Sequence, residues 1–131
     1  MTMNERFTLW YVDDEPINHK VFQVCFDESF DLRFAASGEE VVDRSDELIQ
    51  VSAVISDYRM AGMDGVELLT FVKKTTPQVL TVLLSAFDRE EEIQQAKALG
   101  LIDLCLSKPY NPELLADVLF KECIKRVQGL G

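Results

Sequence analysis

Positive charge is scarce in this sequence. Of 131 residues, 13 are Lys or Arg and 23 are Asp or Glu, so the formal net charge at pH 7 is -10. An acidic surface is repelled by nucleic-acid phosphates and by anionic lipid headgroups, which argues against direct binding to nucleic acid or to membranes. A DNA-binding role would require a separate basic segment.

Long apolar runs and paired cysteines are also missing. No run approaches the roughly 20 apolar residues that cross a bilayer, and residues 1–6 are polar, unlike the apolar core of a signal peptide. Cys25, Cys105 and Cys123 form no Cys-x-x-Cys pair, so neither a disulfide framework nor a zinc site is indicated. We therefore expect a cytoplasmic protein.

What the sequence does have is an alternation of short apolar runs with longer segments of helical period. Its length and its hydrophobic fraction of 47% are typical of one domain. The expected strands cover residues 7–12, 31–35, 51–55, 79–84 and 104–106. Each is followed by a segment of helical pattern, which predicts an α/β domain with a mainly parallel sheet.

Capping residues mark several expected helix starts. Ser/Asp-x-x-Glu boxes occur at Ser37 with Glu40, Asp64 with Glu67, and Asp88 with Glu91. The second of the five helices is expected to run from the first box to about residue 48. The first helix is expected from residue 16 to about residue 29, with an apolar stripe of Ile17, Val21, Val24 and Cys25. The single histidine, His19, falls off this stripe and is expected to be exposed.

Four of the expected strands end on polar residues of different chemical kinds. Asp13 and Asp14 follow the first strand, Asp57 the third, Ser85 the fourth and Lys108 the fifth. Because the carboxyl ends of parallel strands meet at one edge of a sheet, where α/β proteins bind ligands, we expect these side chains to form one site.

These residues suit phosphoryl transfer when they are taken together. Three converging carboxylates repel one another unless a cation joins them, and Mg²⁺ prefers such oxygen ligands. Lys108 and Ser85 would hold phosphoryl oxygens, which leaves Asp57 as the natural acceptor. Each residue alone is weak evidence, since an acidic pair after a strand is more often a helix cap.

The chain resembles the receiver domain of bacterial two-component response regulators over residues 7–127, and residues 128–131 are expected to be a tail or the start of a linker. The matching motifs are Val12-Asp13-Asp14-Glu15, Val54-Ile55-Ser56-Asp57, Met60-Ala61-Gly62-Met63-Asp64-Gly65, Leu84-Ser85-Ala86 and Lys108-Pro109. The resemblance implies a flavodoxin-like five-stranded parallel sheet of order 2-1-3-4-5, with five helices on both faces.

The resemblance also implies a role for each site residue. Asp57 would be the phosphoacceptor, Lys108 would contact the phosphoryl group, Ser85 would sense it, and a cis bond would join Lys108 to Pro109. The implied Mg²⁺ ligands are Asp13, Asp14, Asp57 and the backbone carbonyl of Arg59. The chain would catalyse only its own aspartyl phosphorylation and dephosphorylation.

The implied partners lie on both sides of this reaction. A histidine kinase or phosphotransfer protein would donate the phosphoryl group. A downstream output protein, or an output domain missing from this chain, would meet the face made by the fourth helix, fifth strand and fifth helix. Homodimerisation through that face stays open.

Two positions depart from the family pattern. Cys105 stands where receivers usually carry Tyr or Phe, so the aromatic part of the switch is missing and is rerouted in our hypothesis from Ser85 through Phe87. Ala61 replaces a usual Pro, which is expected to leave its loop less pre-ordered.

Two other classes compete with the receiver interpretation. One is a receiver-like interaction module that works without phosphorylation, as the missing aromatic suggests. The other is a Mg²⁺-dependent hydrolase resembling the haloacid dehalogenase group, which is disfavoured because Asp13 and Asp14 are adjacent rather than spaced as Asp-x-Asp. A Gly-x-x-x-x-Gly-Lys loop is absent, which disfavours a P-loop kinase or GTPase.

Overall fold

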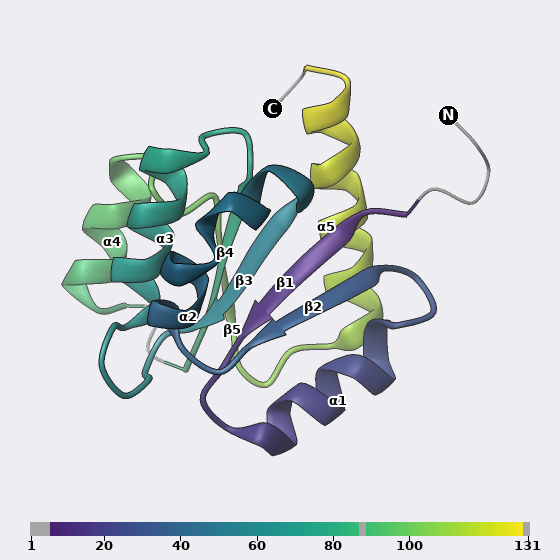
Figure 1. Ribbon diagram of the computed structural model, residues 1–131, viewed down its shortest axis with the longest axis horizontal. Coiled ribbons are helices and arrows are strands. Elements are labelled where there is room, and N and C mark those ends of the chain that lie inside the picture. The colour runs from purple at the N-terminus through teal and green to yellow at the C-terminus, as the bar shows by residue number, and fades with distance from the viewer. Residues whose placement is uncertain (1–5, 87–88, 130–131) are drawn as a thin grey trace.

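A computed structural model describes residues 6–86 and 89–129, in which strands and helices alternate along the chain (Figure 1). The strands are β1 (Thr8–Val12), β2 (Asp31–Ala35), β3 (Ala53–Asp57), β4 (Leu80–Ser85) and β5 (Leu104–Ser107). The helices are α1 (Pro16–Phe26), α2 (Gly38–Asp43), the 3-10 helix η1 (Ser45–Gln50), α3 (Gly65–Thr75), α4 (Glu91–Ala98) and α5 (Pro112–Val127).

The five strands of the described chain form one parallel sheet of order β2-β1-β3-β4-β5. This confirms the predicted flavodoxin-like fold. Because every strand runs in the same direction, all five carboxyl ends lie along one edge of the sheet.

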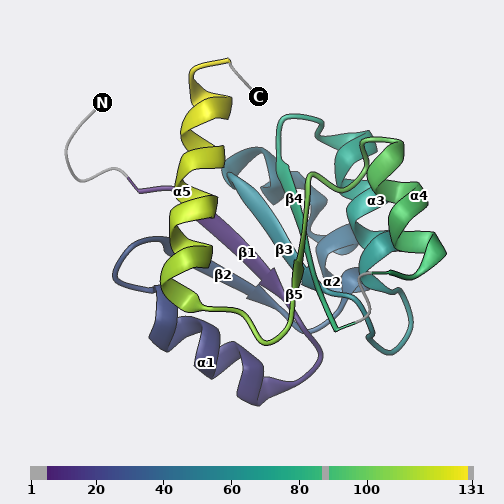
Figure 2. The same ribbon diagram turned by 180° about the vertical axis from the view of Figure 1, so that it is seen from behind.

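Helices cover both faces of the sheet. Helices α1 and α5 pack on one face, and α2, α3 and α4 pack on the other (Figures 1 and 2). Strand β1 contributes to both cores, because successive side chains of a strand point to opposite faces. Trp10 and Val12 belong to the core under α2–α4, whereas Leu9 and Tyr11 belong to the core under α1 and α5.

The capping signals have different outcomes. Asp64 and Glu67 form the complete capping box at the start of α3. The Ser37 hydroxyl accepts a hydrogen bond from the Glu40 N–H at the start of α2. Asp88, the third expected cap, lies outside the described residues, and α4 is preceded by Glu90 at its N-cap position.

The expected single helix to about residue 48 is wrong. Helix α2 ends at Asp43, and η1 follows after Arg44. The Arg44 guanidinium pairs with Glu40 at 2.7 Å and with Glu47 at 2.7 Å, so it joins the two short helices. Helix α1 likewise ends at Phe26, before the expected boundary near residue 29.

The expected inward stripe of α1 is also wrong. The buried residues of this helix are Phe22 and Phe26, and the stripe residues are exposed: Ile17, Val21, Val24 and Cys25. Both sets have helical spacing, so periodicity alone does not choose between them. The aromatic set buries more apolar surface against the sheet, which explains why it faces inward.

Two further expectations concern a peptide bond after β5 and the possibility of a membrane-spanning helix. The Lys108–Pro109 peptide bond is cis, as the resemblance implied. Among residues 6–86 and 89–129, none of the helices combines the length and apolar character that a bilayer crossing requires.

Candidate functional site

The strand register brings the predicted site residues to one edge of the sheet. The paired positions nearest this edge are Val12 with Ser56, Asp57 with Leu84, and Ser85 with Ser107. Asp13 therefore follows β1 directly beside the end of β3. Lys108, one residue beyond β5, donates its backbone N–H to the Ser85 carbonyl at 3.1 Å, which fixes the fifth strand end against the fourth.

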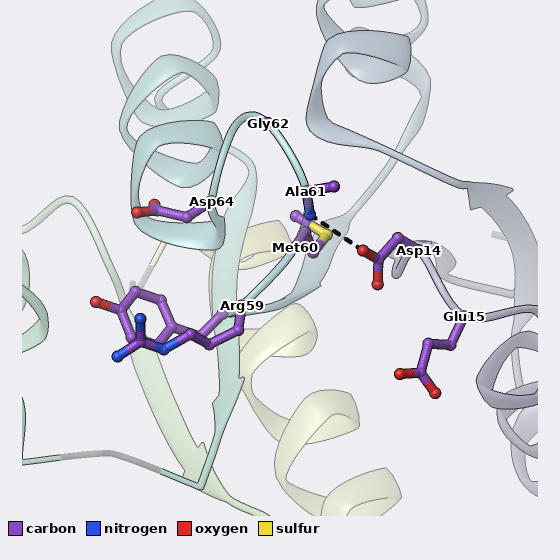
Figure 3. Close-up of a pocket in the computed structure, with 8 residues that line it drawn as sticks. Asp14, Glu15, Arg59, Met60, Ala61, Gly62 and Asp64 are labelled. Atoms are coloured by element: carbon purple, nitrogen blue, oxygen red, sulfur yellow. Dashed lines mark hydrogen bonds between the residues drawn. The ribbon is translucent and has the colours of Figure 1, made fainter.

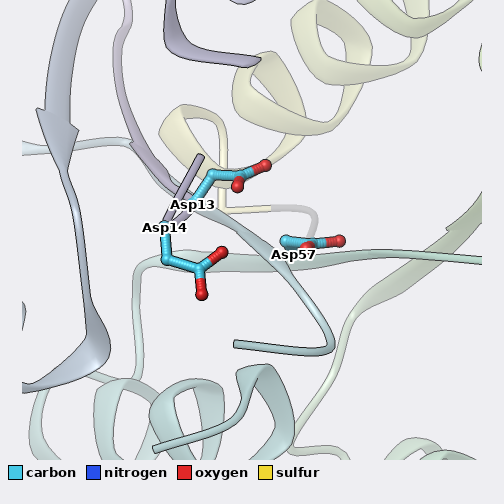
Figure 4. Close-up of side chains that lie close together, drawn as sticks. All are labelled: Asp13, Asp14 and Asp57. Carbon is cyan, nitrogen blue, oxygen red and sulfur yellow. The ribbon is translucent and has the colours of Figure 1, made fainter. Parts of the chain in front are cut away.

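Three carboxylates meet at this edge. One carboxylate oxygen from each of Asp13, Asp14 and Asp57 lies within 4.8 Å of the other two (Figure 4). Asp13 is buried, Asp57 is half-buried and Asp14 is exposed. Three hard anionic oxygen donors with one open side fit a Mg²⁺ ion, which takes one or two carboxylates and keeps several waters.

Lys108 provides the cation of the site. Its Nζ lies 2.6 Å from Oδ1 of Asp57, and the side chain of Asp57 is 16% exposed. Burial raises the pKa of the Asp57 carboxyl, Lys108 lowers it and the charge of Asp13 raises it, with a net increase above the ordinary value. The ionised form of Asp57 is therefore under-stabilised by the protein alone, as expected where a further cation binds.

Helix α3 begins in direct contact with this carboxylate strand. A Cβ atom at Gly65 would lie 2.4 Å from the Asp57 carbonyl oxygen and 2.7 Å from Leu83 Cδ1. The Gly65 N–H donates to the Tyr58 carbonyl at 2.8 Å. Only glycine permits this approach, which places the N-terminus of α3 behind the end of β3.

The predicted switch residues are only partly described. Ser85 is 2% exposed at the end of β4, next to Asp57 on the neighbouring strand. Cys105 is half-buried, pairs with Leu83, and packs against the core under α2–α4. Phe87 lies outside the described residues, so the rerouting hypothesis stays a prediction.

A cleft of about 470 Å³ opens beside the carboxylates (Figure 3). Its lining includes Asp14 and Arg59, whose backbone carbonyl stays a predicted ligand. The Ala61 N–H donates to Asp14 Oδ2 at 3.1 Å, a bond that the usual proline would lack (Figure 3). The Met63 N–H donates to Glu39 Oε2 at 3.0 Å, so two carboxylates hold the loop in place of proline.

Sequence reasoning missed the residues that surround Asp13. Asp13 Oδ2 accepts hydrogen bonds from the Tyr11 hydroxyl at 2.8 Å and from Asn18 Nδ2 at 3.0 Å. His19 is half-buried rather than exposed, stacks on Phe34, and places Nε2 2.6 Å from the Asp13 carbonyl oxygen. The signal for Tyr11 was available, since it precedes Asp13 by two residues and thus shares its face of the chain.

A second missed group links the loop after β3 to α4. The Tyr58 hydroxyl lies 3.0 Å from Glu90 Oε2 and 2.9 Å from Glu92 Oε2. Arg59 forms an ion pair with Glu90, and its guanidinium lies over the Tyr58 ring at 5.0 Å. Burial, followed by the bonds to Glu92 and Glu90, raises the pKa of Tyr58. The residue after Asp57 is thereby tied to the start of α4.

The chain matches a known family along most of its length. The family model described as response regulator receiver domain matches residues 9–120. The hydrogenase transcriptional regulatory protein HoxA of Cupriavidus necator is 30% identical over 118 residues, which cover 88% of this chain and 24% of HoxA. The response regulator protein VraR of Staphylococcus aureus is 33% identical over 86 residues, covering 66% of this chain and 40% of VraR.

The similarity extends to solved structures. The signal receiver domain of an HD domain-containing protein from Pseudomonas fluorescens superposes with a TM-score of 0.86 at 23% identity, covering 98% of this chain and 95% of that one. At this identity the likeness concerns the fold alone. The chain spans less than half the length of the two curated relatives.

Proposed function

The chain belongs to the response regulator receiver domain family of two-component signalling, and from this membership we propose that Asp57 accepts a phosphoryl group from a histidine kinase or phosphotransfer protein. The observation that carries the proposal is the convergence of three carboxylates with the Lys108 ammonium at one edge of the sheet. Asp13 and Asp14, Asp57, Ser85 and Lys108 come from four separate chain segments. The fold itself does not require these polar residues to meet at one point.

The reaction forms one bond and breaks one. A carboxylate oxygen of Asp57 attacks the phosphorus of a phosphohistidine, the P–N bond breaks, and the leaving imidazole nitrogen keeps the electron pair. Asp13, Asp14, Asp57 and the Arg59 carbonyl would hold Mg²⁺, which neutralises charge on the phosphoryl oxygens. Lys108, already 2.6 Å from Asp57, is placed to bind one phosphoryl oxygen, and Ser85 to donate to another.

The product changes the local charge. A phosphoryl group adds roughly -1.5 to -2 charges at pH 7, beside Lys108 and Ser85. Movement of these residues toward the new oxygens would bias two pre-existing states of the surface formed by α4, β5 and α5. We infer that this surface meets a cytoplasmic output protein or an output domain joined beyond residues 7–127, with residues 128–131 as a tail or linker start.

Phosphorylation is tested directly by mass spectrometry. We expect acetyl phosphate with Mg²⁺ to add one base-labile phosphoryl group to the wild-type chain, and Asp57→Asn to abolish this gain. Asp64→Asn is the matched control, because it removes a carboxylate from the same cleft while asparagine still caps α3. Omission of Mg²⁺ should slow the gain strongly.

The outcomes separate the competing classes. A wild-type chain that stays unmodified with every phosphodonor contradicts the proposal and favours an interaction module that works without phosphate, as the missing aromatic at Cys105 suggested. Repeated turnover of unrelated phosphate esters would instead indicate a hydrolase. The proposal requires that each chain gains a single phosphoryl group and that the chain hydrolyses no phosphate ester other than its own aspartyl phosphate.

A further inference from the structure

The buried carboxylate of the site has almost no free hydrogen-bonding capacity. Asp13 is 0% exposed, and its Oδ2 accepts from both the Tyr11 hydroxyl and Asn18 Nδ2. Its Oδ1 accepts from the Glu15 N–H at 2.9 Å. Because a carboxylate oxygen has about two lone-pair sites, Oδ2 is saturated and Oδ1 keeps one site for a cation. Asp14, by contrast, is exposed, and its Oδ2 accepts the Ala61 N–H.

The packing of the core, rather than the carboxylate, fixes the position of the Tyr11 hydroxyl. The Tyr11 ring stacks on Phe22 with centroids 4.1 Å apart and an interplanar angle of 15°. The His19 and Phe34 rings make T-shaped contacts with the Tyr11 ring, with centroids 5.8 Å and 6.3 Å from its centroid. A ring held on several sides brings its hydroxyl to Asp13 with little freedom to move.

We propose that Tyr11 and Asn18 are positioning residues that restrict Asp13 to a one-oxygen contact with the cation and thereby make the site prefer Mg²⁺ over Ca²⁺. This inference rests on the proposed function, which places Mg²⁺ at the carboxylates. Mg²⁺ requires near-octahedral geometry with short single-oxygen contacts, whereas Ca²⁺ takes six to eight oxygens and often binds both oxygens of one carboxylate. Blocking Oδ2 therefore disfavours the larger ion.

A purely structural role would have a different signature. If the two donors only satisfied a buried carboxylate, their removal would lower stability or weaken both ions alike. If they select the ion, their removal frees Oδ2 for a second contact. Mg²⁺ affinity then falls because Asp13 is less well oriented, while Ca²⁺ affinity holds or improves. The ratio of the two dissociation constants is the quantity that distinguishes these roles.

The test is calorimetric titration of the full chain with MgCl₂ and, separately, with CaCl₂. Tyr11→Phe removes the hydroxyl and keeps the stacked ring, and Asn18→Leu removes the second donor at similar volume. We expect each to reduce the preference for Mg²⁺ over Ca²⁺ roughly tenfold, the lower end of what loss of an outer-shell partner costs. Tyr110→Phe is the control, since its hydroxyl is not among the Asp13 partners in the described structure.

The results test the ion selectivity and the proposed metal site separately. If the wild-type chain binds Mg²⁺ and both variants keep the same preference within about twofold, the inference is overturned while the proposed function stands. Equal weakening of both ions also overturns it. If the wild-type chain binds no Mg²⁺ at all, the proposed metal site fails and the inference with it. If Tyr11→Phe does not fold, as judged by circular dichroism, Asn18→Leu decides.

Discussion

At the scale of single residues, Asp57 experiences opposing electrostatic influences. Burial and the neighbouring Asp13 favour its protonated form, and Lys108 favours the ionised form, with a net rise in the pKa of the carboxyl. The native chain then holds this proton at pH values where the unfolded chain has released it. Stability consequently falls as the pH rises through this window and stays lower above it.

Asp57→Asn should therefore stabilise the chain in metal-free buffer near neutral pH, because asparagine resembles the protonated acid. The expected rise in Tm is a few degrees, and it should shrink on acidification as Asp57 itself gains a proton. Thermal melts between pH 3 and pH 7 with a chelator would measure it. A lower Tm for Asp57→Asn at pH 7 would show that the bond to Lys108 outweighs burial.

Residues at strand ends could be predicted because their signal is local. Asp13, Asp57 and Lys108 each follow an apolar run, so the chain itself marks them. The placement of His19 was wrong because it depends on Phe34, which comes from another strand and leaves no trace in local periodicity. Contacts between distant segments of the chain determine how far an amphipathic side chain such as His19 is buried.

At the scale of elements, Asp103 joins three segments at the edge of the sheet opposite the site. Its Oδ2 lies 2.6 Å from Lys73 Nζ of α3 and 3.0 Å from Arg126 of α5, and it accepts the Thr81 N–H of β4 at 2.9 Å. Burial alone would raise the pKa of Asp103, but the bonds from Lys73 and Thr81 and the charge of Arg126 lower it. This stabilisation is present above the ordinary pKa and is lost as the pH falls through the lowered one.

Asp103→Asn should destabilise the fold by roughly 1.5–3 kcal/mol at pH 7, the usual range for hydrogen bonds to a charged group. The loss should shrink as the pH falls through the lowered pKa of the wild-type carboxyl, because that carboxyl then becomes neutral as well. Urea unfolding of both chains over a series of pH values below 7 measures the loss and its decrease. Asp31→Asn is the control, because its ion pair with Arg6 is exposed and is expected to contribute little. Equal effects of the two variants would contradict the assignment.

Elements were predictable where one signal dominated. The complete capping box of Asp64 and Glu67 started α3 as expected, and the ends of the strands lie within two residues of the expected positions. The inward face of α1 was predicted wrongly because apolar residues occupy two faces of this helix. Helix α2 ended early because Arg44 binds carboxylates on both sides of the break, which periodicity does not record.

At the scale of the whole molecule, the strand alternation and the family resemblance together gave the correct sheet order. Alternation implied parallel strands, but the order β2-β1-β3-β4-β5 came from the resemblance. The edge strand β5 has half-buried side chains between α4 and α5, which leaves a partly apolar surface. Phosphorylation is expected to act on this surface, since Lys108 directly follows β5 and the buried Ser85 ends the neighbouring β4.

If the surface formed by α4, β5 and α5 also mediates homodimerisation, the beryllofluoride-bound chain should self-associate through it. Sedimentation velocity with and without beryllofluoride and Mg²⁺ would detect a shift from monomer toward dimer. Leu99→Glu, directly after α4, should suppress the shift, whereas Val24→Glu on the exposed face of α1 should not; both side chains are at least 75% exposed, so folding should persist. A chain that stays monomeric throughout would assign this face to a different partner.

The directions of β1 and α5 have a practical consequence. Strand β1 starts at the edge of the sheet opposite the carboxylates, and α5 runs back toward that same edge, where Arg126 near its end pairs with Asp103 (Figures 1 and 2). A fluorescent label or a surface tether attached at either end would stand away from Asp57. Immobilised chains would thus present the carboxylate edge of the sheet to solution, where binding of the proposed kinase can be measured on a sensor chip.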